Sequence, residues 1–243
     1  MFAKLKKWFH TLCDTSPEEK APVRNQSRRN EDLSAEAQLS IFMDLYLYDR
    51  FPTSNLFSSI RRITSKEEQL NGIDVEFIGT DNKVYNVDEK AQLYYLNQNL
   101  PTFAFELVSY QKGFDTIGWL CNPNLKTDFY MLIWPFATTN TCKEIRWEQF
   151  TKVECLLIQK QKILKLLADN GLTINRLKAD AASIRASGKV GKIPIQGLSG
   201  IYYFASNPLH YKEAPINIII SKQKLTEIAQ RKYVVTPEQI TST

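Results

Sequence analysis

Two alternating segments joined by a turn constrain the fold of this chain more than any other feature. Apolar Ile73, Val75 and Phe77 alternate with acidic residues, and polar residues alternate again along residues 83–92. Between the two segments, residues 79–82 read Gly-Thr-Asp-Asn, which is typical of a tight turn. The sequence therefore predicts two antiparallel strands in a hairpin.

Alternation also predicts which side chains share a face of this hairpin, because successive residues of a strand point to opposite faces. We expect Asp74 on one face of the first strand. Asp88, Lys90 and Gln92 should lie together on one face of the second strand, whereas the side chain of Glu89 should point away from them. Carboxylates and an ammonium group are therefore expected to converge.

Such a group of side chains has a specific chemical use. Hydrolysis of a phosphodiester needs stabilised negative charge and hydroxide near neutral pH, and Mg²⁺ held by one or two carboxylates supplies both. A lysine two residues beyond a carboxylate lies beside it, where its ammonium orients water and stabilises charge. Asp74, Asp88 and Lys90 therefore indicate metal-dependent phosphodiester hydrolysis. The structural alternative is a salt bridge from Lys90 to Asp74 or Asp88.

The same residues resemble the motif of the restriction-endonuclease-like, or PD-(D/E)XK, nuclease superfamily. Asp74 matches its first acidic position, and Asp88-Glu89-Lys90 matches its (D/E)-x-K tripeptide. The resemblance implies that Asp74, Asp88 and the backbone carbonyl of Glu89 bind Mg²⁺ or Mn²⁺. It also implies that Lys90 positions the attacking water, and that Gln92 is the polar residue that often follows the tripeptide.

Two glutamates are further candidates. Several branches of the superfamily use a glutamate on the first helix, and Glu36 is the nearest one in this sequence. Glu106 lies on a predicted strand near the presumed site, with a solvent-facing charge as the alternative. The resemblance covers residues 34–136 and departs from the family at two points. Ile73 stands where the family has proline, and residues 93–101 are too few for the long helix that usually follows the tripeptide.

The other patterns predict an α/β fold with a central mixed sheet flanked by helices, a restriction-endonuclease-like core and a C-terminal extension of helices and strands. Residues 1–33 are expected to be a basic amphipathic segment and a linker, residues 34–150 the nuclease core, and residues 151–243 the extension packed on it. Helices are predicted at residues 34–51, 148–170, 174–187 and 222–230, and further strands at 56–64, 102–110, 128–136 and 216–220.

Charge is distributed unevenly around a net value of +5. Residues 31–151 carry 17 acidic and 10 basic side chains, whereas residues 152–192 carry 9 basic and 3 acidic ones. The basic segment ends in a glycine- and lysine-rich loop at residues 188–192. It predicts electrostatic contacts with DNA phosphates, with a solvated face as the alternative. Residues 202–204 (Tyr-Tyr-Phe) either stack on bases or pack in the core.

The remaining features narrow the class of protein. The four scattered cysteines indicate reduced, buried thiols, and no apolar run is long enough to span a bilayer. The first twelve residues lack the apolar stretch of a secretory signal, so we expect a cytoplasmic protein. The sequence favours a DNA nuclease that needs a metal but no small-molecule cofactor. A two-stranded cut would favour a homodimer. The alternatives are a non-catalytic nucleic-acid-binding or interaction module, and a membrane-surface protein directed by residues 1–12.

Overall fold

The two alternating segments form the predicted hairpin. Strands β2 (Val75–Gly79) and β3 (Val84–Ala91) pair in antiparallel register, with Val75 opposite Val87. The turn between them is closed by the N–H of Gly79, which donates to the Lys83 carbonyl at 2.8 Å. Strand β1 (Phe57–Arg62) pairs with the other edge of β2, so the three strands form a meander.

This meander belongs to the larger of two sheets in the computed structural model, which describes residues 29–50, 57–111, 113–209 and 213–243. The seven-stranded sheet has the order β1-β2-β3-β6-β7-β11-β12, and the five-stranded sheet has the order β5-β4-β10-β9-β8. Strand β6 lies parallel to β3, whereas the other paired neighbours are antiparallel. The predicted α/β class with a mixed sheet is confirmed.

The remaining elements follow in chain order. The helices are α2 (Arg29–Met43), the π-helical turn η1 (Asp44–Tyr48), α3 (Lys66–Leu70), the 3-10 turns η2 (Leu93–Tyr95) and η3 (Trp147–Gln149), α4 (Lys160–Asp169), α5 (Ile174–Ser187) and α6 (Lys222–Ile228). The strands are β4 (Thr102–Gln111), β5 (Phe114–Ile117), β6 (Phe129–Ala137), β7 (Phe150–Gln159), β8 (Gly191–Pro194), β9 (Ile201–Ala205), β10 (Ile216–Ser221), β11 (Arg231–Val235) and β12 (Ile240–Ser242).

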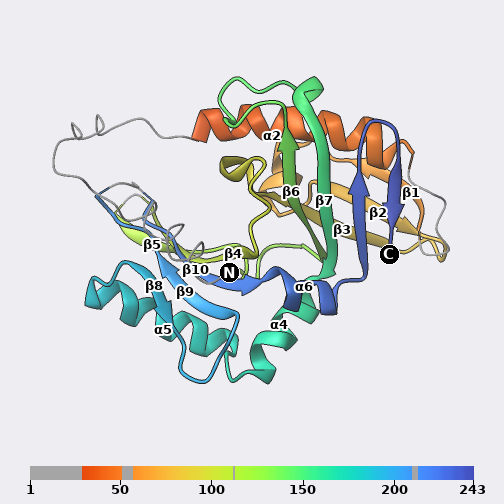
Figure 1. Cartoon of the computed structure of the whole chain (residues 1–243). Coiled ribbons are helices and arrows are strands. Elements are labelled where there is room, and N and C mark those ends of the chain that lie inside the picture. Colours follow the sequence, from red (N-terminus) through yellow and green to blue (C-terminus); the bar gives the residue numbers. More distant parts are fainter. Residues whose placement is uncertain (1–28, 51–56, 112, 210–212) are drawn as a thin grey trace, which may run out of the picture.

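Strand β6 contributes to two hydrophobic cores. Phe129, Met131 and Ile133 point into the first core, and the residues between them point into the second. The first core lies between α2 and one face of the seven-stranded sheet (Figure 1). The second core lies between the other face, the five-stranded sheet and helices α4, α5 and α6. A strand buried on both faces is what the nearly all-apolar stretch 128–136 predicts.

One predicted element is wrong. The expected helix at residues 148–170 is instead a strand, β7, followed by the shorter helix α4. Val153 and Leu157 point into the first core and Leu156 into the second, and β7 pairs with both β6 and β11. A strand with two buried faces has no polar alternation, so its apolar residues also fitted a helical spacing. The seven-stranded sheet therefore contains strands from both the predicted core, residues 34–150, and the predicted extension, residues 151–243.

The first helix also differs from its prediction at both ends. It begins at Arg29, so residues 29–33 are helical and not part of a linker. Its α-helical part ends at Met43, and a π-helical turn continues it to Tyr48. The expected basic segment at residues 1–12, the rest of the linker and residue 51, the predicted end of this helix, lie outside the described residues.

Two further expectations concern cysteines and membranes. Cys121, Cys142 and Cys155 are buried, as expected, whereas Cys13 lies outside the described residues. Within the described part of the chain, no helix has the length and apolar character needed to cross a membrane.

The packing of β6 makes a quantitative prediction. Met131 is fully buried at the centre of the first core, so Met131→Ala should lower the free energy of unfolding by about 2–5 kcal/mol. Ile41 on α2 is 38% exposed, so Ile41→Ala should change it by less than about 0.5 kcal/mol. Urea unfolding followed by circular dichroism measures both. Equal effects of the two substitutions would contradict the assignment of β6 to a doubly buried position.

Candidate functional site

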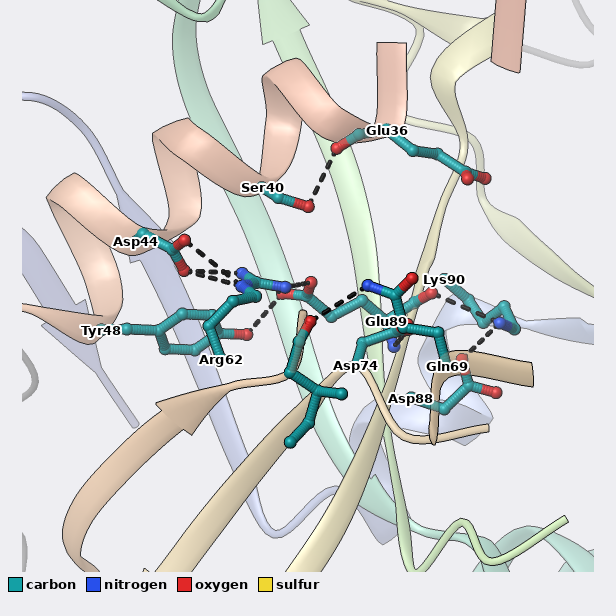
Figure 2. A network of polar contacts seen from close by, with 11 residues as sticks. Glu36, Ser40, Asp44, Tyr48, Arg62, Gln69, Asp74, Asp88, Glu89 and Lys90 are labelled. Atoms are coloured by element: carbon teal, nitrogen blue, oxygen red, sulfur yellow. Dashed lines mark hydrogen bonds and ion pairs between the residues drawn. The ribbon is translucent and has the colours of Figure 1, made fainter. Parts of the chain in front are cut away.

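The hairpin brings together three of the residues that the sequence singles out. Asp74 directly precedes β2, and its Oδ2 accepts a hydrogen bond from the N–H of Glu89 at 2.8 Å (Figure 2). Asp88 lies on β3 and is only 2% exposed. Lys90 donates from Nζ to Asp88 Oδ1, and its Nζ lies 3.4 Å from the Glu89 carbonyl oxygen. Asp74, Asp88, Lys90 and the backbone of Glu89 therefore form one cluster.

The charges of this cluster are not balanced. Burial, and next the negative charge of Asp88, raise the pKa of Asp74 to about 7. Burial would lower the pKa of Lys90, but the charges of Asp88 and Asp74 outweigh burial, and the pKa of Lys90 is raised. Two carboxylates therefore face one ammonium group, and an additional positive charge would be stabilised here.

The two weaker candidates lie near Lys90. Glu36 is on α2, and its charge contributes to the raised pKa of Lys90. Figure 2 shows the Glu36 side chain extending from α2 toward the side of the hairpin that carries Lys90. Glu106 is on β4 and half-buried, so a role near the site and a solvent-facing charge both stay open. Burial raises the pKa of Glu106, and its hydrogen bond with Ser109 and the charge of Lys90 offset part of that rise.

Gln92 occupies a different position from the other predicted residues. It follows β3, and its Nε2 donates to the Thr102 carbonyl at the start of β4, at 2.9 Å. Its buried Oε1 accepts no hydrogen bond within the described part of the chain. A buried acceptor without a donor costs about 1–3 kcal/mol. Gln92 thus joins the seven-stranded sheet to the five-stranded sheet, beside the cluster of charged groups.

Aromatic side chains that the sequence did not indicate cover Lys90 and Asp88. The Lys90 Nζ lies 5.6 Å from the centroid of the Trp119 ring. Trp119 packs edge-on against Tyr130 of β6, and the Tyr130 hydroxyl donates to the Trp119 carbonyl at 3.3 Å. Burial, and next the charge of Asp88, raise the pKa of Tyr130. These rings cover part of the cluster, in which the Lys90 side chain is 29% exposed, and reduce the screening of its charges by water.

A second lysine also lies within electrostatic reach of Asp88. Lys160 begins α4, is only 8% exposed, and its Nζ lies 3.5 Å from the Asn122 carbonyl oxygen. Burial lowers the pKa of Lys160, and the charge of Asp88 offsets part of that change. Sequence reasoning missed Lys160 because the predicted helix at residues 148–170 placed it in mid-helix, where a lysine is an ordinary surface residue.

The donor atoms of the cluster fit a hard divalent cation. The described residues contain no group of three or more His, Cys, Asp or Glu side chains that could hold a metal ion. Asp74, Asp88 and the Glu89 carbonyl nevertheless offer oxygen ligands, and Mg²⁺ is usually held by only one or two carboxylates. Burial, and next the charge of Asp88, raise the pKa of Asp74, so a bound cation would stabilise the ionised form of Asp74.

This charge imbalance can be tested without any metal. The pKa of Asp74 is higher in the folded protein than in the unfolded chain, so its ionisation costs stability as pH rises from about 4 to about 7. Asp74→Asn should therefore stabilise the EDTA-treated protein at about pH 8, by on the order of 1 kcal/mol, and less at about pH 5. Urea unfolding at the two pH values measures the difference.

The matched control is Glu76→Gln on the same strand. Glu76 forms an ion pair with Arg61, so its substitution should give no gain in stability at either pH. A loss of stability in Asp74→Asn at the higher pH would contradict a cost of ionising Asp74 in the folded protein.

Comparisons with known proteins give no assignment. No protein-family model matches the chain, and neither a curated protein nor a solved structure matches it. The geometry and charges of Asp74, Asp88 and Lys90 are therefore the basis for a functional assignment.

Proposed function

We propose that this protein is a Mg²⁺-dependent nuclease that hydrolyses phosphodiester bonds of DNA. The observation that carries the proposal is the convergence of Asp74, Asp88 and Lys90 on one face of the β2–β3 hairpin. Asp74, Asp88 and the Glu89 carbonyl would hold the metal, which can be Mg²⁺ or Mn²⁺. When bound, the metal would neutralise phosphate charge and lower the pKa of water.

The residues of the chain have separate tasks in this reaction. The two carboxylates provide negative charge for the cation, and the N–H of Glu89 keeps Asp74 oriented. The Lys90 ammonium lies beside Asp88 and the Glu89 carbonyl, where it can orient water and stabilise charge that develops on the phosphate. Trp119 shields Lys90 from solvent on one side, which strengthens these interactions.

The order of elements supports the proposal. Helix α2 precedes the β1–β2–β3 meander, and β6 then adds to the sheet parallel to β3. A restriction-endonuclease-like core has a helix, a three-stranded meander, a second helix and a further strand. In this chain the short turn η2 and the strands β4 and β5 occupy the place of that second helix. The short connection at residues 93–101 predicts this departure.

One observation favours a second candidate, a non-catalytic nucleic-acid-binding or interaction module. Lys90 forms an ion pair with Asp88, which is also what a purely structural salt bridge would give. A structural pair and a catalytic pair differ in their response to substitution and to metal. Cleavage assays therefore separate the two candidates.

Substitution of the cluster should abolish cleavage. We expect Asp88→Asn and Lys90→Ala to lower the rate of plasmid cleavage in Mg²⁺ or Mn²⁺ by at least about 100-fold, and to leave DNA binding largely intact. The control is Lys83→Ala, because Lys83 is exposed and directly precedes the same strand. EDTA should stop cleavage by the unsubstituted protein. Cleavage that survives in both variants would overturn the assignment of the site to Asp88 and Lys90. A protein that cuts no DNA would favour the non-catalytic module.

The basic segment gives a separate prediction about DNA affinity. Four of its basic residues are paired with acids inside the chain: Lys152, Lys165, Arg176 and Arg185. Lys189, which precedes β8, and Lys192, which lies in β8, are exposed. The Lys192 ammonium lies 4.4 Å from the centroid of the Tyr202 ring. We infer that these two lysines contact phosphates.

Charge reversal at this loop should weaken binding. Lys189→Glu with Lys192→Glu should lower the affinity for DNA about 10-fold or more, and should reduce the slope of affinity against salt by about two. The control pair is Lys66→Glu with Lys83→Glu, which changes the same charge outside the segment. Fluorescence anisotropy at several salt concentrations measures both quantities. Equal losses of DNA affinity in the two double variants would mean that net charge alone sets the affinity.

A further inference from the structure

Behind the cluster, on the opposite face of β3, lies a network of four charged and polar side chains: Asp44, Tyr48, Arg62 and Glu89. The Tyr48 hydroxyl donates to Glu89 Oε1 at 2.6 Å, and Arg62 Nη1 forms an ion pair with Glu89 Oε2 (Figure 2). Arg62 also donates to Asp44 Oδ1, from Nε at 2.9 Å and from Nη2 at 2.7 Å. We call these four side chains the Arg62 network.

Burial makes this network costly for the protein to maintain. Tyr48 is 8% exposed, and its ring packs against Phe77 in the first core at 5.9 Å between centroids. The side chains of Arg62 and Glu89 are 20% and 11% exposed. Replacing a buried ion pair by apolar residues is often neutral or stabilising, because the charges lose their hydration. Asp44 is more exposed, at 36%, and the three charged side chains lie beside the first core. Stability alone therefore does not explain why they are held there.

The helix that contributes to the network is itself unusual. Asp44 and Tyr48 are the first and last residues of the π-helical turn η1, in which the N–H of Asp49 donates to the Asp44 carbonyl at 2.9 Å. π-helical turns are rare and occur frequently at functional sites. The network thus connects three elements, η1, β1 and β3. They meet at Glu89, the residue between Asp88 and Lys90.

Glu89 links the network to the cluster through its backbone. Its side chain is held on one face by Tyr48 and Arg62. Its N–H donates to Asp74 Oδ2 at 2.8 Å, and its carbonyl oxygen lies 3.4 Å from the Lys90 Nζ. The contacts that hold the Glu89 side chain therefore also restrain the backbone N–H that orients Asp74 and the carbonyl oxygen that would bind the metal.

We propose that the Arg62 network is a positioning device for the divalent-cation site, and that it acts through the backbone of Glu89. Tyr48 and Arg62 are then positioning residues that touch neither metal nor substrate. The proposal rests on the proposed function, because it concerns the same site. Side chains that hold metal ligands in place without touching the metal typically change metal affinity or activity 10- to 100-fold when substituted.

The affinity of the protein for Mn²⁺ tests the positioning role of the Arg62 network directly, without DNA. Mn²⁺ is titrated into the full-length protein, and the free ion is measured by electron paramagnetic resonance. Arg62→Met and Glu89→Gln should each raise the Kd for Mn²⁺ about 10-fold or more. Tyr48→Phe removes one hydroxyl and keeps the ring in the core, so it should raise the Kd less and provides a variant that folds. Thermal unfolding in EDTA is measured in parallel.

The matched control is Arg61→Met. Arg61 is the neighbour of Arg62 on β1 and pairs with Glu76 on β2, but its side chain is 62% exposed and the pair lies outside the network. Arg61→Met should leave the Kd for Mn²⁺ unchanged within about twofold, because exposed ion pairs contribute little. A role limited to stability would lower the unfolding temperature of the network variants without changing their Mn²⁺ affinity.

The outcomes separate this inference from the proposed function. Folded Glu89→Gln and Tyr48→Phe proteins that bind Mn²⁺ as tightly as the unsubstituted protein would overturn the positioning role. An unsubstituted protein that binds no Mn²⁺ would overturn both proposals. Mn²⁺ binding that depends on the network, in a protein that cuts no DNA, would support the positioning role and overturn the nuclease.

Discussion

Asp88 is a carboxylate buried between two sheets. Much of the surrounding structure compensates for the free energy that is lost when this charge is removed from water. An isolated buried charge is strongly unfavourable, so it must be paired. Lys90 pairs with it directly, and Lys160 approaches from the start of α4. Trp119 and Tyr130 cover the pair. Asp74 is the group that this arrangement does not neutralise, and that imbalance is the physical basis for expecting a cation.

Strand alternation predicted the part of the site that depends on short-range geometry. The hairpin and the faces of Asp74, Asp88 and Glu89 followed from a period of two residues, because a slip of one residue would turn every side chain to the wrong face. Alternation could not show which residues pack against the other face of the hairpin, where the Glu89 side chain lies. Tyr48 and Arg62 meet Glu89 across 41 and 27 residues of sequence, so only the tertiary fold reveals their contact.

Two of the errors have a common cause, which is the burial of β7 on both of its faces. Strand β7 reads as a helix because both of its faces are apolar, and the same error placed Lys160 in mid-helix. Residues 202–204 divide between two environments in β9. Tyr203 is buried in the second core, whereas its neighbours Tyr202 and Phe204 are half-buried. Charge counts along the sequence likewise miss pairs such as Arg185 with Asp115, whose partners are 70 residues apart.

The parallel pairing of β3 and β6 has a consequence for the order of folding. A parallel pair requires a crossover, and here the crossover carries η2, β4 and β5 before the chain returns. Contacts between distant segments form late, because the entropy of closing the loop is lost before the contacts are gained. The hairpin with its carboxylates can form early and remain hydrated. Its charges lose water only when β6 docks and the crossover closes over Asp88.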